Sequence, residues 1–311
     1  MNSSASYINL TQPFISGSRT AEVMKIIFEV LTMICFCVFL YYISLILHVF
    51  FTAPHVRDIG RYVLFAHMLI NDTLYLTAAI ILVMCSALWV YIPVPICYAI
   101  ISLATATFRI TPYNLAAMAL ERYAAICFPL RHVTLCTSQR SKCVIAAIWV
   151  MGLSPNIADV IILSSLGEKT FFSSNVKCSQ DSLTLTLQQD AVRSVSTIIS
   201  LILVGLILVF TYVRVMYVAK SLSSSSSSAS KAVRTVILHA FQFLLCIMSL
   251  TSSFTETRFR DYISFLPIAN FFFFTCLPRC LSPLVYGIRD GVLSKYIRQM
   301  HLAKPDGLNV Q

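Results

Sequence analysis

Charged residues are scarce in this chain. Lys, Arg, Asp and Glu make up 12% of its 311 residues, whereas a soluble globular domain carries about 25%. Hydrophobic residues make up 58%. The apolar runs recur, and each helical span across a bilayer needs about 20 such residues, so the composition excludes both a soluble domain and a single membrane anchor. It indicates an integral membrane protein with several spans.

The sequence also lacks the patterns that mark common enzyme and metal sites. It has only 8 Gly residues, and neither a Gly-rich phosphate loop nor a nucleophile elbow occurs. The 6 His residues are scattered without metal-ligand spacing. We therefore expect no enzymatic activity, no metal and no cofactor.

The polar segment of residues 1–22 lacks a basic start followed by an apolar core, so we expect no cleaved signal peptide. Asn2 and Asn9 begin glycosylation sequons, and sugars on them would place this end outside the cell. A third sequon, at Asn71, lies inside an apolar run and is expected to stay unmodified.

Seven apolar stretches predict an all-α membrane protein, a bundle of seven transmembrane helices within residues 23–288. The expected spans are about 23–51, 62–88, 96–126, 143–166, 191–219, 231–254 and 263–288. Residues 221–230 are nearly all Ser and predict a flexible hinge before the sixth span. Residues 289–311 predict a short amphipathic helix on the cytosolic surface and a tail.

The distribution of basic residues sets the expected orientation. With the amino end outside, the cytosolic segments carry twice as many Lys and Arg residues as the outer segments. The carboxyl end is then cytosolic. The net charge of +10 follows from this topology, so we expect contact with the lipid bilayer and no nucleic-acid binding.

The cysteines fit the same orientation. Of the 11 Cys residues, only Cys97 and Cys178 fall at outer loop or loop–helix positions. The outer compartment is oxidising, so we expect these two to form a disulfide that pins the long outer loop onto the third helix.

The segment Met118–His132, MALERYAAICFPLRH, carries the most distinctive chemistry. Glu121 and Arg122 form an ionised pair where a long apolar helix ends. Such a pair is costly within lipid but tolerable at the membrane–water boundary, where it can also change partners.

Several motifs together resemble a known family. Cys97, the Glu121–Tyr123 triplet, Trp149, Tyr212 and Pro283–Tyr286 resemble a rhodopsin-class G-protein-coupled receptor. MALERYAAICFPLRH resembles the MAYDRYVAICxPLRY stretch of odorant receptors. Lys231, Ala232, Thr235 and His239 resemble their sixth-helix motif KAxxTCxxH, and the MALERY form is most similar to fish-type odorant receptors. Ser44 and Ser282 stand where the family has Asn, which suggests a divergent branch.

The resemblance implies a multi-pass plasma-membrane receptor that binds a small odorant from outside. It implies activation of a heterotrimeric G protein of the stimulatory olfactory type, which raises cAMP. The residues implied for the switch and for G-protein coupling are Glu121, Arg122, Tyr123, Tyr212, His239, Pro283 and Tyr286. Two alternatives stay open. A small transporter or channel is disfavoured because no internal repeat is found, and a pheromone or other chemosensory receptor differs only in ligand and tissue.

Charged residues within spans are functional hypotheses by default. Asp72 matches the acid that coordinates sodium in this class, and we expect Arg279 to pair with it in place of the ion. Arg109 either anchors a carboxylate or another acceptor of the ligand, or forms a structural pair with Asp159, and we favour a structural or mixed role. The expected ligand pocket comprises Thr105, Phe108, Arg109, Asp159, Ser196, Ser200, Thr251, Phe254, Phe272 and Cys276.

The family also has ligand anchors that this chain lacks. The outer half of the third span contains no Asp, which excludes the amine-pairing aspartate of aminergic receptors. The seventh span contains no Lys, which excludes a retinal Schiff base.

Overall fold

The computed structural model describes residues 5–53, 57–166, 172–179, 181–221, 237, 240–241, 243–244, 247–248 and 265–281. The chain divides into two compact units, Met1–Ile46 with Leu244–Gln311, and Leu47–Phe243. Most of the sixth expected span and the expected amphipathic helix at 289–311 lie outside the described residues.

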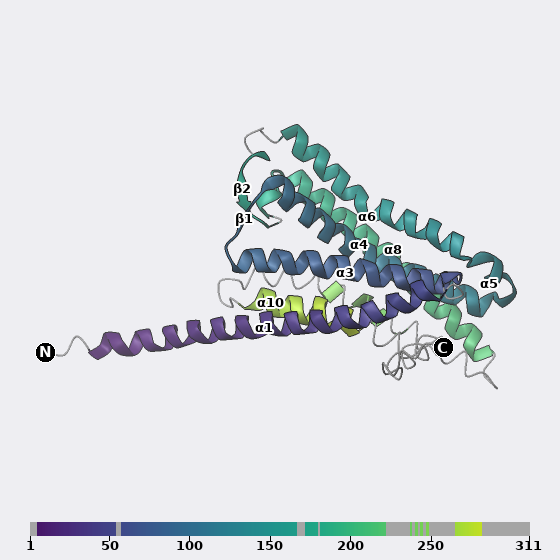
Figure 1. Cartoon of the computed structure of the whole chain (residues 1–311), viewed down its shortest axis with the longest axis horizontal. Coiled ribbons are helices and arrows are strands. Elements are labelled where there is room, and N and C mark those ends of the chain that lie inside the picture. The colour runs from purple at the N-terminus through teal and green to yellow at the C-terminus, as the bar shows by residue number, and fades with distance from the viewer. Residues whose placement is uncertain are drawn as a thin grey trace, which may run out of the picture. The chain divides into compact units, whose positions relative to one another are not determined.

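The described elements are almost entirely helical (Figure 1). In chain order they are α1 (Ala5–Thr52), α3 (Gly60–Ala87), β1 (Tyr91–Pro93), α4 (Val94–Cys127), α5 (Pro129–Leu135), α6 (Ser138–Leu166), β2 (Asn175–Lys177), the 3₁₀ turn η1 (Asp181–Leu183), α8 (Leu187–Ser221), α10 (Leu266–Asn270) and the π-helical turn η2 (Phe271–Cys276). Within this described part, five helical segments are long and apolar enough to span a membrane: Arg19–Thr52, Gly60–Ala87, Val94–Cys127, Ser138–Ser165 and Leu187–Val218. Each overlaps one of the first five expected spans.

Helix α4 is the centre of the larger unit, since it contacts α3, α6 and α8. Half of its most apolar stretch is buried, more than in any of the other four long helices. Small residues let helix backbones approach closely in a membrane bundle, and those buried on α4 are Ala104, Ala106, Ala116 and Ala119. The apolar side chains that α8 exposes suit contact with lipid; they include Ile198, Ile199, Ile202, Leu206 and Val209.

One disulfide and one pair of hydrogen-bonded strands join the region where α4 begins to the segment that follows α6. Cys97 and Cys178 form the expected disulfide, with their Cα atoms 5.5 Å apart. Strands β1 and β2 pair antiparallel, with Ile92 opposite Val176. Helix α3 ends before Trp89, whose φ of 53° is unusual for a bulky residue, and Lys177 Nζ lies 4.1 Å from the centre of its ring.

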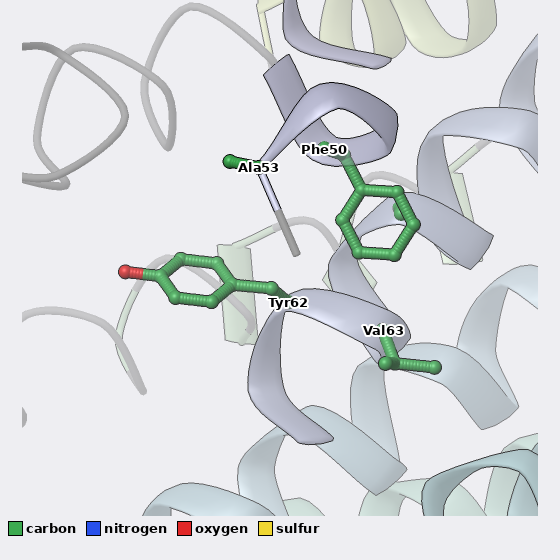
Figure 2. Close-up of a cluster of buried hydrophobic side chains, with 5 residues drawn as sticks. Phe50, Ala53, Tyr62 and Val63 are labelled. Carbon is green, nitrogen blue, oxygen red and sulfur yellow. The ribbon is translucent and has the colours of Figure 1, made fainter. Parts of the chain in front are cut away.

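At the other end of this unit, apolar residues join the last turn of α1 to the first turns of α3. Phe50 from α1 and Ala53, the residue after α1, pack with Tyr62, Val63 and Ala66 from α3, and Figure 2 shows four of these side chains together. The Oγ of Ser138 donates to the carbonyl of Arg57 at 3.2 Å, which ties the same corner to the start of α6.

Gly60 begins α3 where two backbone segments approach closely. A Cβ on Gly60 would lie 2.6 Å from the carbonyl oxygen of Cys136, so the Gly60→Ala variant forces the backbone apart. We expect it to destabilise the protein by about 1–3 kcal/mol. Gly205→Ala is the matched control, because its Cβ would meet only the Phe243 ring at 3.5 Å and Ala favours a helix. The melting temperature of the purified protein in detergent should fall for Gly60→Ala but not for Gly205→Ala.

In the smaller unit, an aromatic cluster joins α1 to the helical segment 265–281. The ring of Phe28 lies 6.2 Å from that of Phe265, 6.0 Å from that of Phe272 and 5.6 Å from that of Phe273, measured between centroids. Phe272, expected in the ligand pocket, therefore makes packing contacts. The π-helical turn η2 begins beside this cluster, and such turns are rare and frequently occur at functional sites.

Candidate functional site

Glu121 is held by two basic side chains, Arg122 and His132, where α4 ends. Its side chain is buried, with 6% of it exposed. Its Oε2 lies 3.6 Å from Arg122 Nε, and its Oε1 lies 3.0 Å from His132 Nε2 on α5. Helix α5 follows directly after Phe128, which is how His132 returns to α4. The structure thus contains the Glu121–Arg122 pair and adds a partner that the sequence argument did not select.

The surroundings of this pair are partly aromatic and neutral. Tyr123 packs edge-on against Phe128 and Phe210, with ring centroids 5.7 and 5.5 Å apart. Burial raises the pKa of the nearby Cys136 thiol, and the negative charge of Glu121 adds to the effect. Cys136 therefore stays a neutral thiol at cellular pH and does not compete for the cations.

The other expected switch residues are less completely described. Tyr212 is exposed on α8. His239, Pro283 and Tyr286 lie outside the described residues. Their roles stay predictions.

A second polar cluster links α6 to α8. Arg193 Nε donates to Asp159 Oδ2 at 2.6 Å, and both side chains are at least nine-tenths buried. Arg193 Nη1 donates to Thr184 Oγ1 at 2.8 Å. Among the described residues Asp159 makes its ion pair with Arg193 and none with Arg109, although its charge also acts on Arg109. Arg193 lies in the expected fifth span and is not among the site residues expected from the sequence, so this pair was not predicted.

Asp159→Asn should strongly destabilise the protein. The substitution leaves the buried Arg193 guanidinium without its charged partner, and breaking one side of a buried pair costs about 3–5 kcal/mol. Asp190→Asn is the control: its carboxylate is 57% exposed and 3.8 Å from Arg193, so we expect a loss below about 1 kcal/mol. The two variants are compared by thermal unfolding in detergent. Equal melting temperatures would contradict the importance of the Asp159–Arg193 pair.

Arg109 lies on α4 and is directed to an amide. Its Nη1 donates to Asn156 Oδ1 at 2.6 Å. Asn156 comes three residues before Asp159 on α6, so the two lie on neighbouring parts of one helix face. The Nδ2 of Asn156 donates to the Ser102 carbonyl at 2.7 Å and to Ser102 Oγ at 2.9 Å. The orientation of the amide is therefore fixed by its own donors.

The remaining expected pocket residues divide between several places. Thr105 Oγ1 donates to Asn156 Oδ1 at 3.3 Å, and Phe108 packs against Tyr75. Ser200 Oγ lies 2.6 Å from the hydroxyl of Tyr113. Ser196 bonds only locally, to the carbonyl of Arg193. Phe272 and Cys276 belong to the smaller unit, and Thr251 and Phe254 are among the residues not described.

Asp72 and Arg279 are both buried, at 2% and 7% exposure. They lie in different units, so their pairing stays a prediction. Next to Asp72, Asn71 Nδ2 donates to the Thr107 carbonyl at 3.0 Å and to Thr111 Oγ1 at 3.1 Å. These bonds join α3 to α4 beside the expected sodium-site acid.

A third polar network crosses α3, α4 and α6. Trp149 Nε1 donates to His67 Nε2 at 2.8 Å, so the other ring nitrogen of His67 carries the proton that it donates to Asn114 Oδ1 at 2.9 Å. His67 is thus a neutral imidazole of fixed tautomer. Trp149, selected from the sequence only as a family marker, has a structural role in this network.

Three thiols of the smaller unit lie close enough to bind a soft metal ion. The sulfur atoms of Cys35, Cys276 and Cys280 are all within 4.8 Å of one another. Cys280 Sγ is 3.9 Å from Cys276 Sγ and 3.6 Å from the Cys35 carbonyl, which it meets as a thiol donor. Thiolates suit Cu(I) and zinc, but the hydrogen bond to a carbonyl describes a neutral thiol packed inside a helix bundle.

The chain resembles known receptors over most of its length. The family described as 7 transmembrane receptor (rhodopsin family) matches residues 44–286. Odorant receptor 131-2 of Danio rerio is 31% identical over 258 residues, which cover 81% of this chain and 79% of that protein. Olfactory receptor 51E1 of Homo sapiens is 28% identical over 199 residues, 61% of each chain, and Olfactory receptor 6Q1 of Homo sapiens is 26% identical over 187 residues, 57% of each. The chain belongs to the rhodopsin family of seven-transmembrane receptors, and within it to the odorant receptors.

Proposed function

We propose that this receptor binds a small extracellular molecule within its helix bundle and activates a heterotrimeric G protein that raises cAMP. The membership of the odorant receptors supports this function and speaks against a transporter, a channel or an enzyme. The observation that carries the proposal is the arrangement of Glu121 between Arg122 and His132 where α4 ends.

The proposed mechanism uses this arrangement as a restraint. In the resting state Glu121 holds Arg122 against α4 and α5. In the signalling state Arg122 leaves Glu121 and turns towards Tyr212 and Tyr286, and the cavity that opens accepts a helix of the G protein. Ligand drives the change only through tighter binding to the open state, and a shift from 1:99 to 99:1 requires about 5.5 kcal/mol of differential binding.

The direct test is ligand-dependent signalling in cells that carry a cAMP reporter. The receptor is challenged with a panel of water-soluble odorants, amino acids and organic acids, and surface level is measured on an extracellular tag. We expect at least one compound to raise cAMP, and Arg122→Ala to abolish that response at an unchanged surface level. Signalling that survives Arg122→Ala would contradict the proposed mechanism.

Finer features belong to the same proposal. The amino end lies outside the cell, supported by the excess of basic residues in the opposite segments and by the sequons at Asn2 and Asn9. Residues 290–301 lie on the cytosolic membrane surface as an amphipathic helix. Arg279 pairs with Asp72 in place of the sodium ion expected there, so sodium should leave basal signalling of this receptor unchanged.

A further inference from the structure

Arg109 is a buried cation that lacks its own counter-ion in the part of the chain that the structure describes. Its exposed fraction is 7%. A guanidinium within a membrane span is costly unless a charge or several acceptors compensate it. Asp159 is the nearest acid that acts on it electrostatically, but Arg193 holds Asp159 Oδ2 at 2.6 Å. Two arginines therefore share one buried carboxylate.

Asp190, an exposed acid in this region, does not compensate for the excess positive charge of the two arginines. Asp190 is 3.8 Å from Arg193, and its side chain is 57% exposed. A solvent-exposed pair of this kind contributes little because water and salt screen it. The buried part of the cluster, Arg109, Arg193 and Asp159, thus carries one excess positive charge. A bound anion would remove it.

The guanidinium of Arg109 is held in a fixed direction, and some of its N–H donors remain available to a ligand. Nη1 is bonded to Asn156 Oδ1, and the amide of Asn156 is fixed in turn by its two bonds to Ser102. Among the described residues, Nε and Nη2 of Arg109 have no hydrogen-bond acceptor. The fully enclosed polar atoms without partners include Asp159 Oδ1 but no nitrogen of Arg109, so these donors are not completely enclosed by the described residues. The Nε–Nη2 edge of a guanidinium matches the two oxygens of a carboxylate.

We propose that Arg109 binds the carboxylate of the receptor's ligand, so that small organic acids are its agonists. The proposal rests on the receptor function proposed above and names the ligand class of that site. Asn156 positions Arg109, and Arg193 holds Oδ2 of Asp159, the buried carboxylate of this cluster among the described residues. Thr105 lies beside them, since it also bonds Asn156 Oδ1.

The test uses full-length receptor in reporter cells and one matched chemical series. Unbranched carboxylic acids are compared with the methyl esters and primary alcohols of the same chain lengths. We expect the acids to be the more potent agonists of the unchanged receptor. Arg109→Gln keeps amide donors but removes the charge, and we expect it to raise the EC50 of the acids roughly 10- to 100-fold relative to the esters. For Arg109→Lys, we expect an EC50 of the acids between those of the unchanged receptor and Arg109→Gln. Lysine keeps the charge but lacks the bidentate geometry of a guanidinium.

A second variant tests the charge argument without removing Arg109. Asn156→Asp places a carboxylate at the position that now accepts the bond from Nη1, so it should neutralise Arg109 from within and produce the same selective loss for acids. Arg140→Gln, which removes an exposed arginine, is the control and should change neither series. Surface level is measured for every variant.

Three results would overturn the proposal. The first is that the acids are inactive on the unchanged receptor while Glu121→Gln still raises basal cAMP; the ligand class is then wrong and the receptor function stands. The second is an equal loss for acids and neutral compounds in Arg109→Gln and Asn156→Asp at normal surface level, which assigns Arg109 a structural role. The third is that no compound raises cAMP and Glu121→Gln does not raise basal cAMP. Both the proposed receptor function and the proposed ligand class are then wrong.

Discussion

Replacing Cys97 or Cys178 with Ser is expected to remove most of the receptor from the cell surface. The bridge joins residues 81 positions apart in the chain, and cross-linking a loop of that length stabilises a protein by about 4 kcal/mol in the chain-entropy model. It also sits in a buried cluster with Val94, Ile101 and Leu183. Its loss therefore releases both β2 and the start of α4. Surface level is measured by antibody labelling of intact cells.

The control for this prediction is another cysteine. Cys143 is exposed and unbonded at the start of α6, so Cys143→Ser should leave the surface level unchanged. The double variant Cys97→Ser with Cys178→Ser should resemble either single variant, because each already lacks the bridge. A double variant that returns to the normal level would show that an unpaired thiol, rather than the missing bridge, causes the defect.

Glu121→Gln is expected to raise cAMP in the absence of ligand. Glutamine keeps the size of the side chain but removes the charge that holds both Arg122 and His132. Loss of about 1.4 kcal/mol of resting-state stabilisation increases the active population roughly tenfold while that population is small. Basal reporter activity, divided by surface level, measures the change.

The two partners of Glu121 should differ in their effects. His132→Gln removes the shorter contact, of 3.0 Å, but leaves Arg122 in place, so it should raise basal signalling less than Glu121→Gln. Glu29→Gln removes a carboxylate that has only a 4.0 Å contact with the exposed Lys25, and basal signalling should stay unchanged. Basal activity in Glu121→Gln equal to that of the unchanged receptor would show that the pair does not restrain the resting state.

The sequence predicted those features that depend on composition or on one segment. Apolar runs predicted helices because a bilayer requires about 20 such residues in each span. Cys97 and Cys178 could be paired because only they lie at outer positions in the expected topology. Glu121 and Arg122 are neighbours in the chain, so their contact needed no tertiary information.

Contacts between helices could not be predicted in the same way. His132 reaches Glu121 only because α5 folds back after Phe128. Arg193 meets Asp159 because of the register between α6 and α8, which hydropathy does not define. Asn156 is an uncharged amide in an apolar run, and only its spacing marks it as a partner of Arg109. It lies three residues before Asp159, so the two share a helix face.

The amide of Asn156 also has a mechanical consequence. From α6 it reaches both Ser102 and Arg109, which are about two turns apart on α4. Any slide or rotation of α6 along α4 would break these bonds together, in surroundings that offer little water to replace them. We therefore expect α4 and α6 to move together as one frame when the receptor changes between its silent and signalling states.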